Sequence, residues 1–144
     1  MPKAYASSVI NAPAGDVWAV VRDFNALPDW HPAIAQSEIE DGKASDQVGA
    51  VRSFTLHDGA HIRERLLYLS DSTMSCQYNF ELTPFDVQNY MATLRLTPIT
   101  DGDQCFIEWW ATFDCDIAAT DEWLDTFSNG VFQGGFDALK ERFA

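Results

Sequence analysis

Basic residues are scarce in this chain. It has nine Lys and Arg against 22 Asp and Glu, which gives a formal net charge of −13. Proteins that bind nucleic acids need clustered cations to neutralise phosphates, and this sequence contains no basic run. The same shortage disfavours attachment to an anionic membrane surface. The sequence therefore predicts neither partner, and the excess acid is most simply a repulsive, solubilising surface.

Cysteines and long apolar runs are also few. Cys76, Cys105 and Cys115 are odd in number and have no C-x-x-C spacing, which fits a reducing compartment better than a disulfide framework. No apolar run approaches the roughly 20 residues of a membrane span. The stretch Met1–Ile10 has one lysine and no long apolar core, so it does not read as a signal peptide. We expect a cytoplasmic protein without stable membrane insertion.

The common catalytic and cofactor motifs are missing as well. There is no G-x-S-x-G, P-loop, G-x-G-x-x-G or Cys/His nucleophile pair, so we predict no nucleotide cofactor and no covalent catalysis. His57 and His61 flank Asp58 at a spacing that a metal could use, but a metal site needs a third rigid ligand. An Asp-Gly turn already explains this stretch, and we predict no metal.

Aromatic residues, by contrast, are abundant. Ten Phe, five Trp and four Tyr occur within 144 residues. They suit either a dense core or the walls of an apolar pocket. A chain of this length is most economically one domain, here 1–144, because it can bury a substantial core on its own.

The hydrophobic pattern changes period twice along the chain. Alternation predicts a strand over Lys3–Ile10, and a helix follows with Asn11 as a possible cap and Pro13 in its first turn. A short helical turn ends before Pro32. Alternation then predicts strands over 33–40, 50–56, 61–69, 73–80, 87–98 and 104–114. From Thr120 the three- and four-residue steps of one long helix return.

Successive strands joined by tight turns form antiparallel sheets. The Asp58-Gly59 pair between two of the strands is a strong hairpin signal. The fold class predicted is α+β, with seven antiparallel strands and the helices gathered on one face.

Three motifs carry a resemblance to a known superfamily. They are P-x-x-x-V-W-x-V-V-x-D-F-x-x-L-P-x-W-H-P (Pro13 to Pro32), V-G-x-V-R-x-F (Val48 to Phe54) and E-R-L (Glu64 to Leu66). In this order they resemble the helix-grip, START-like superfamily of the birch pollen allergen and the abscisic-acid receptors. The likeness is greatest to the bacterial polyketide cyclase/dehydrase family. It implies a curved sheet wrapped around a long C-terminal helix, with two short helices after the first strand and an internal cavity.

The resemblance places Trp30 and His31 on a segment that lines or closes the cavity mouth. The Asp-Gly hairpin would be a flexible lid there. The alternative is that Trp30 plugs the end of the core while His31 caps a turn.

Charged residues fall on strand faces that should be apolar. If Phe54 points inward, Arg52 shares its face, and Glu64 shares a face with Ile62. The same reasoning puts Phe106, Glu108, Trp110 and Thr112 on one inward face of the last strand. With Tyr78 and Tyr90 these residues would form a polar patch, and any buried charge among them must be paired.

The abscisic-acid receptors resemble this chain at Arg52, Glu64, Tyr90 and Glu108, where their matching residues form a water-linked patch in the ligand cavity. A lysine that holds the hormone's carboxylate has no equivalent here, and the loop sequences that recruit their partners differ. Hormone reception is therefore not implied, although a pocket with a polar floor is.

Two interpretations of the charges stay open. In the first, Arg52 and Glu64 form a salt bridge with a structural role only. In the second, Glu64 or Glu108 is a general acid or base. Burial would then raise the pKa of that carboxyl group, and the positive charge of Arg52 would lower it. In the last helix, Trp123, Phe127 and Val131 either roof the cavity or are plain core. Glycines 130, 134 and 135 allow close packing, leave volume for a ligand, or break the helix.

The favoured function is binding of a small, largely hydrophobic ligand, which is lipid-, polyketide- or aromatic-like. The alternatives are a cyclase or dehydratase of the lyase or isomerase type and a protein-interaction module. A homodimer is possible if Leu67 and Trp109 are exposed on the convex face. The predicted ligand-binding residues are Trp30, His31, Arg52, Phe54, Glu64, Tyr78, Tyr90, Glu108, Trp110, Trp123, Phe127 and Val131.

Overall fold

One antiparallel sheet organises the whole chain in the computed structural model, which describes residues 1–144. The strand order is β1-β7-β6-β5-β4-β3-β2. The strands are β1 (Lys3–Ile10), β2 (Ile34–Ile39), β3 (Val51–Leu56), β4 (His61–Ser70), β5 (Ser75–Leu82), β6 (Gln88–Ile99) and β7 (Gln104–Asp114). The helices α1 (Ala14–Val21) and α2 (Leu27–Trp30) connect β1 to β2. The predicted fold class is confirmed.

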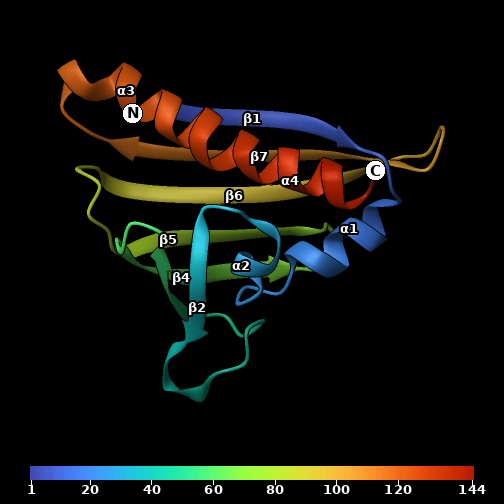
Figure 1. The fold of residues 1–144 in the computed structure, drawn as a ribbon, viewed down its shortest axis with the longest axis horizontal. Coiled ribbons are helices and arrows are strands. Elements are labelled where there is room, and N and C mark those ends of the chain that lie inside the picture. The colour runs from blue at the N-terminus through green and yellow to red at the C-terminus, as the bar shows by residue number, and fades with distance from the viewer.

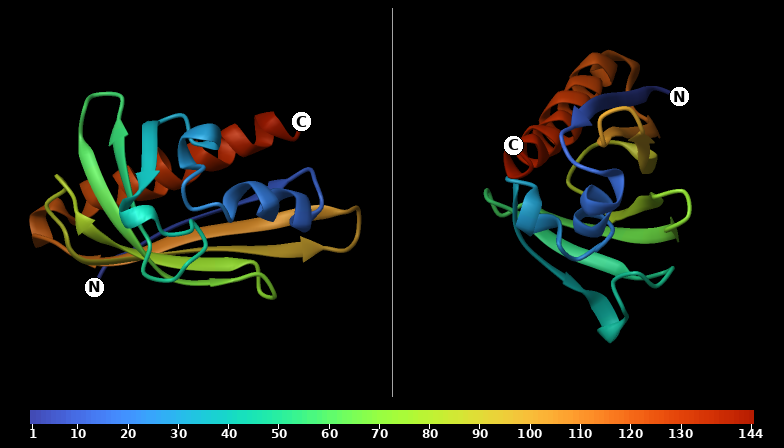
Figure 2. Two further views of the ribbon diagram at one scale, coloured as in Figure 1. Left: turned by 90° about the horizontal axis from the view of Figure 1, so that it is seen from below. Right: turned by 90° about the vertical axis from the view of Figure 1, so that its right-hand side faces the viewer.

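The sheet curves around the C-terminal helix. Register shifts interrupt the β2–β3, β4–β5 and β6–β7 ladders, and such bulges bend a strand and increase its twist. Figure 1 shows the helix lying along β1, β7 and β6, with α1 and α2 beside its C-terminal end. Figure 2 shows the β3–β4 hairpin and β2 rising from the rest of the sheet on the side of the helix. The helix therefore lies inside the curve.

The C-terminal helix has a π-helical middle. It consists of α3 (Thr120–Asp125), η3 (Thr126–Gln133) and α4 (Gly134–Arg142), and the junction residues Thr126 and Gly134 keep helical φ and ψ. The expectation of one long helix from Thr120 is confirmed, and no break occurs at the glycines. Short 3₁₀ turns, η1 (Glu40–Gly42) and η2 (Ile117–Ala119), complete the elements.

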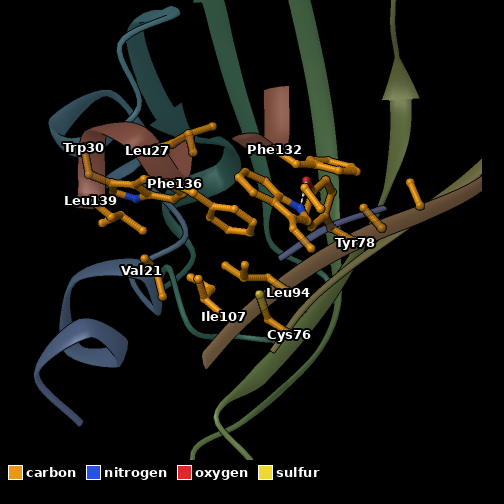
Figure 3. Packing of buried hydrophobic residues seen from close by; sticks show 14 of the residues in the cluster. Val21, Leu27, Trp30, Cys76, Tyr78, Leu94, Ile107, Phe132, Phe136 and Leu139 are labelled. Carbon is orange, nitrogen blue, oxygen red and sulfur yellow. Dashed lines mark hydrogen bonds between the residues drawn. The ribbon is translucent and has the colours of Figure 1, made fainter. Parts of the chain in front are cut away.

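The π segment decides which helix residues reach the sheet. Phe127 and Phe132 are five residues apart and both are fully buried, because i→i+5 hydrogen bonds widen the turn and shift the buried face by one residue. Val131, which simple four-residue spacing would put in the core, is only half-buried. Figure 3 shows Phe132 and Phe136 pointing from the helix toward residues of the sheet such as Tyr78 and Leu94.

The phase of β7 differs from our prediction. Its buried residues are Cys105, Ile107, Trp109, Ala111 and Phe113, and the alternate set, which includes Glu108 and Trp110, faces outward. None of these buried residues is charged, so no ion has to be removed from water when this face is buried. The expectation that Trp109 is exposed is also wrong, since this residue is only 2% exposed. Trp109 therefore gives no support to the predicted homodimer.

The start of α1 is a smaller correction. Its N-cap residue is Pro13, and no side chain caps the helix, so Asn11 does not have the role we expected. No helix of the structure has both the length and the apolar composition required to cross a membrane.

Candidate functional site

A small cavity lies between the sheet and the C-terminal helix. Its volume is about 80 Å³, and thirteen of its sixteen lining residues are hydrophobic. The larger hollows on the molecule open broadly to solvent, and the one over β2 and β3 has a single hydrophobic lining residue. Ligand sites are typically concave and apolar with a few polar groups, which matches the smaller cavity. Its lining consists of Leu27, His31, Ala33, Ile34, Arg52, Phe54, Leu56, Ile62, Glu64, Tyr78, Phe80, Phe85, Tyr90, Trp109, Phe127 and Val131.

A buried ion pair forms the polar part of the lining. Arg52 of β3 and Glu64 of β4 are register partners and are 5% and 4% exposed. Nε and Nη2 of Arg52 lie 2.8 and 2.7 Å from the same oxygen, Oε1 of Glu64. Nη1 donates to the carbonyl oxygen of Phe24 at 3.0 Å. The rings of Phe24 and Tyr78 lie 3.9 and 4.8 Å from the guanidinium carbon. Arg52 is thus held by a carboxylate, a carbonyl and two aromatic rings.

Glu64 keeps one oxygen free of the protein. Both contacts from Arg52 go to Oε1, and no hydrogen bond within the protein reaches Oε2. Burial raises the pKa of Glu64, while the charge and hydrogen bond of Arg52 oppose that rise. Because Glu64 lines the cavity, Oε2 is an acceptor available to a molecule inside it.

Two tyrosines complete the polar surface. The hydroxyl oxygen of Tyr78 accepts a hydrogen bond from Nε1 of Trp109 at 3.1 Å. Tyr90 stacks on Phe80, with ring centroids 3.9 Å apart, and its side chain also interacts with that of Tyr78. Burial raises the pKa of both phenols well above 10, and the charge of Glu64 adds to this effect. Both therefore stay protonated and can donate.

His31 is buried against the π segment. Its Nε2 lies 2.7 Å from the carbonyl oxygen of Val131, and its Nδ1 accepts from the backbone N–H of Ala33 at 3.2 Å. These partners require a neutral ring that carries its proton on Nε2. Burial lowers the pKa of His31, the hydrogen bond to Val131 opposes this, and the charge of Arg52 lowers it further. His31 both lines the cavity and caps the turn at Ala33.

Gly135 allows the Trp30–His31 segment to pack closely on the helix. A Cβ at this position would lie 3.0 Å from atoms of both His31 and Trp30 and 3.1 Å from Trp109. A Cβ at Gly134 would meet only the Asn129 carbonyl, at 3.9 Å. Of the three explanations for the glycines, close packing fits Gly135.

Five lining residues are not fully buried, so the cavity comes near the surface beside them. These are Ala33, Leu56 of β3, Phe80 of β5, Phe85 from the β5–β6 connection, and Val131. His57 of the β3–β4 hairpin donates through Nε2 to the carbonyl oxygen of Pro32 at 2.9 Å, and their chain neighbours Leu56 and Ala33 line the cavity. The hairpin and the segment after α2 are therefore tied together at the mouth.

Most predicted site residues line the cavity, but four do not. Glu108 lies on the outer face of the sheet, where Tyr5 donates to it at 2.8 Å and Arg95 lies 3.1 Å away. Trp110 stacks there on Tyr5. The prediction that Glu108 and Trp110 face the cavity is wrong, and Glu108 loses its candidate catalytic role. The other two, Trp30 and Trp123, do not form part of the lining.

Those two tryptophans lie behind lining residues. Trp30 packs on Trp109, with ring centroids 5.8 Å apart, so it plugs the end of the core. Trp123 stacks on Phe127 and contacts Phe85, with centroids 5.7 and 5.6 Å apart. The predicted residues that do line the cavity are His31, Arg52, Phe54, Glu64, Tyr78, Tyr90, Phe127 and Val131.

Sequence reasoning missed several lining residues. Trp109 was missed because the phase of β7 was inverted, although the uncharged set around it was a usable signal. Phe85 lies in a short turn, where no periodicity shows which way a side chain points. The two histidines considered for a metal point elsewhere: His57 toward Pro32, and His61 toward the hydroxyl of Ser53 at 2.7 Å.

Comparison with known proteins agrees with this geometry. Residues 1–144 match the family described as "Polyketide cyclase / dehydrase and lipid transport". The chain belongs to this family. No curated protein matched its sequence significantly.

Several solved structures resemble the chain over nearly its whole length. XoxI from Bacillus cereus has 30% identity and a TM-score of 0.89, and the match covers 99% of this chain and 96% of that one. A Thermobifida fusca protein has 33% identity and a TM-score of 0.91, with coverages of 99% and 93%. Norcoclaurine synthase from Thalictrum flavum, solved with dopamine and hydroxybenzaldehyde, is 18% identical with a TM-score of 0.78 and coverages of 98% and 85%, a likeness of fold alone.

Proposed function

We propose that the protein binds a small, largely apolar molecule in the cavity between the sheet and the C-terminal helix. The observation that carries this proposal is the lining itself: thirteen hydrophobic side chains surround a single buried ion pair that keeps one acceptor free. A purely structural core gains nothing from such an arrangement, because a salt bridge there is often no better than apolar residues of the same volume. Membership of the polyketide cyclase/dehydrase family supports the same function.

The size of the cavity implies movement at its mouth. An apolar cavity of about 150 Å³ binds benzene, whereas the volume here is about 80 Å³. A ring-sized ligand therefore has to displace side chains such as Leu56 and Phe85, which are only half-buried. The hydrogen bond from His57 to Pro32 would be broken and remade as the hairpin opens.

Filling the open end should test the proposal. Val131→Phe puts a larger side chain at the half-buried rim, while Val9→Phe makes the same change on the exposed face of β1. We expect aromatic probes to raise the melting temperature of the parent protein and of Val9→Phe, and to do so much less for Val131→Phe. Native mass spectrometry of the purified protein would identify any small molecule that copurifies. Equal binding by both variants, with no copurified molecule in the parent, would contradict a site in this cavity.

A catalytic function is a second candidate because of Glu64. A buried carboxylate with a raised pKa and a free oxygen can remove or return a proton on a bound carbonyl compound, as a cyclase or dehydratase requires. Deuterium incorporation next to the carbonyl of phenylacetone, followed by NMR, would detect this chemistry. We expect Glu64→Gln to abolish any acceleration while the compound still binds. An unaccelerated exchange rate in the parent protein would leave binding as the function.

A further inference from the structure

The polar groups in the cavity differ in whether the protein already uses them. The guanidinium of Arg52 is directed to Oε1 of Glu64 and to the carbonyl of Phe24, and aromatic rings lie close to it on Phe24 and Tyr78. Its positive charge is therefore balanced within the protein. A ligand carboxylate entering the cavity would find no uncommitted cation to pair with.

The remaining groups point to a different ligand chemistry. Oε2 of Glu64 accepts no hydrogen bond from the protein, so it can accept one from a ligand. Tyr78 and Tyr90 line the same cavity. The hydroxyl oxygen of Tyr78 accepts from Trp109, and the side chain of Tyr90 also interacts with that of Tyr78. Both nitrogens of His31 are occupied. The cavity thus offers one strong acceptor and phenolic donors close to an otherwise apolar wall.

We infer that the ligand carries an uncharged hydroxyl on an apolar body, as in a phenol or an alcohol, and that carboxylates are excluded. This inference rests on the proposed binding function. A hydroxyl both donates and accepts, so it can donate to Oε2 of Glu64 while it accepts from a tyrosine. A carboxylate can only accept, and its charge would lie unpaired beside Glu64, in a chain whose net charge is already −13.

Three para-substituted toluenes test the inference directly. p-Cresol, p-xylene and p-toluate carry a hydroxyl, a methyl and a carboxylate on the same ring. A phenol has a pKa of about 10 and is neutral at pH 7, whereas p-toluate is ionised. Dissociation constants would be measured by calorimetry at neutral pH. We expect p-cresol to bind about tenfold more tightly than p-xylene, because a hydrogen bond to a charged acceptor makes the binding free energy more favourable. We expect p-toluate not to bind.

Variants should show which groups of the cavity cause the preference for p-cresol over p-xylene. Arg52→Met combined with Glu64→Leu should remove the preference for p-cresol over p-xylene, since the acceptor is gone. Tyr90→Phe, which changes neither member of the ion pair and keeps the aromatic ring, should reduce the preference for p-cresol over p-xylene. Glu108→Gln changes a carboxylate on the outer face and should leave the preference unchanged.

The outcomes distinguish this inference from the proposed function. Equal affinities for p-cresol and p-xylene, or measurable binding of p-toluate, would overturn the inference and leave ligand binding intact. A preference that survives both the double variant and Tyr90→Phe would overturn it too. Failure of all three compounds to bind would overturn the proposed function together with the inference.

Discussion

Replacing Gly135 by alanine should destabilise the protein, although alanine normally stabilises a helix. Gly135 lies in α4, where it faces Trp30, His31 and Trp109. The added Cβ would come within 3.0 to 3.1 Å of a ring atom of each of these three residues. Those rings belong to the packed end of the core and have little freedom to withdraw.

The expected magnitude follows from two opposing terms. Alanine in place of glycine inside a helix gains about 1 kcal/mol. Inserting a methyl group into a well-packed region costs about 1 to 3 kcal/mol. The cost should prevail because His31 is fixed by hydrogen bonds at both nitrogens, to Val131 and Ala33. The net loss of unfolding free energy should be about 0 to 2 kcal/mol.

Gly134→Ala provides the matched control. It changes the neighbouring residue of the same helix, where the new Cβ would make only an ordinary contact of 3.9 Å. Urea denaturation followed by tryptophan fluorescence should find Gly134→Ala up to about 1 kcal/mol more stable than the parent. Gly135→Ala should be about 1 to 3 kcal/mol less stable than Gly134→Ala. If both variants gained stability equally, the close approach at Gly135 would be refuted.

Three further predictions concern buried polar groups. Arg52→Met alone should lower the free energy of unfolding, measured by urea denaturation, by about 3 to 5 kcal/mol, because it leaves Glu64 buried without a partner. Combining it with Glu64→Leu should restore most of that loss, and a double variant as unstable as the single one would contradict this. Tyr78→Phe should cost about 1 to 3 kcal/mol by thermal or urea unfolding, since Trp109 Nε1 loses its acceptor; an unchanged stability would refute the importance of that bond. Burial lowers the pKa of His31 below its ordinary 6.5, so the unfolded chain takes up the proton first. Its contribution to stability is present above pH 6.5 and is lost as the pH falls toward the folded pKa. Unfolding free energies measured across this range should fall less steeply for His31→Gln, and an identical slope would contradict the prediction.

The inner faces of β3 and β4 could be predicted from the sequence. Phe54 and Ile62 set the phase of their strands, and a one-residue slip would have exposed both. Arg52 and Glu64 then had to point inward as a pair, which the structure confirms. The Asp58-Gly59 turn was equally readable because its chemistry is local: Gly59 has a φ of +89° in a short hairpin.

We predicted the phase of β7 inverted, although the sequence held a signal for the correct one. The adjacent Trp109 and Trp110 are equally bulky and do not by themselves choose between the two faces. The set that contains Trp109 is wholly uncharged, whereas the set that contains Trp110 also contains Glu108, which belongs to the solvent face. In the structure β7 pairs with β6, its neighbour in the chain, and with β1, which is distant in sequence. The C-terminal helix packs on the face of β7 that carries Trp109, where Phe132 stacks on its ring.

The sequence by itself determined the features that have short-range causes. These are the number and order of the strands, the long last helix, the hairpin, and the inward charges of β3 and β4. Only the tertiary structure decided the π turn that buries both Phe127 and Phe132, and the placement of Phe85 at the mouth. It also decided which oxygen of Glu64 the protein leaves free. Each of these depends on contacts between segments far apart in the chain, and no local periodicity encodes them.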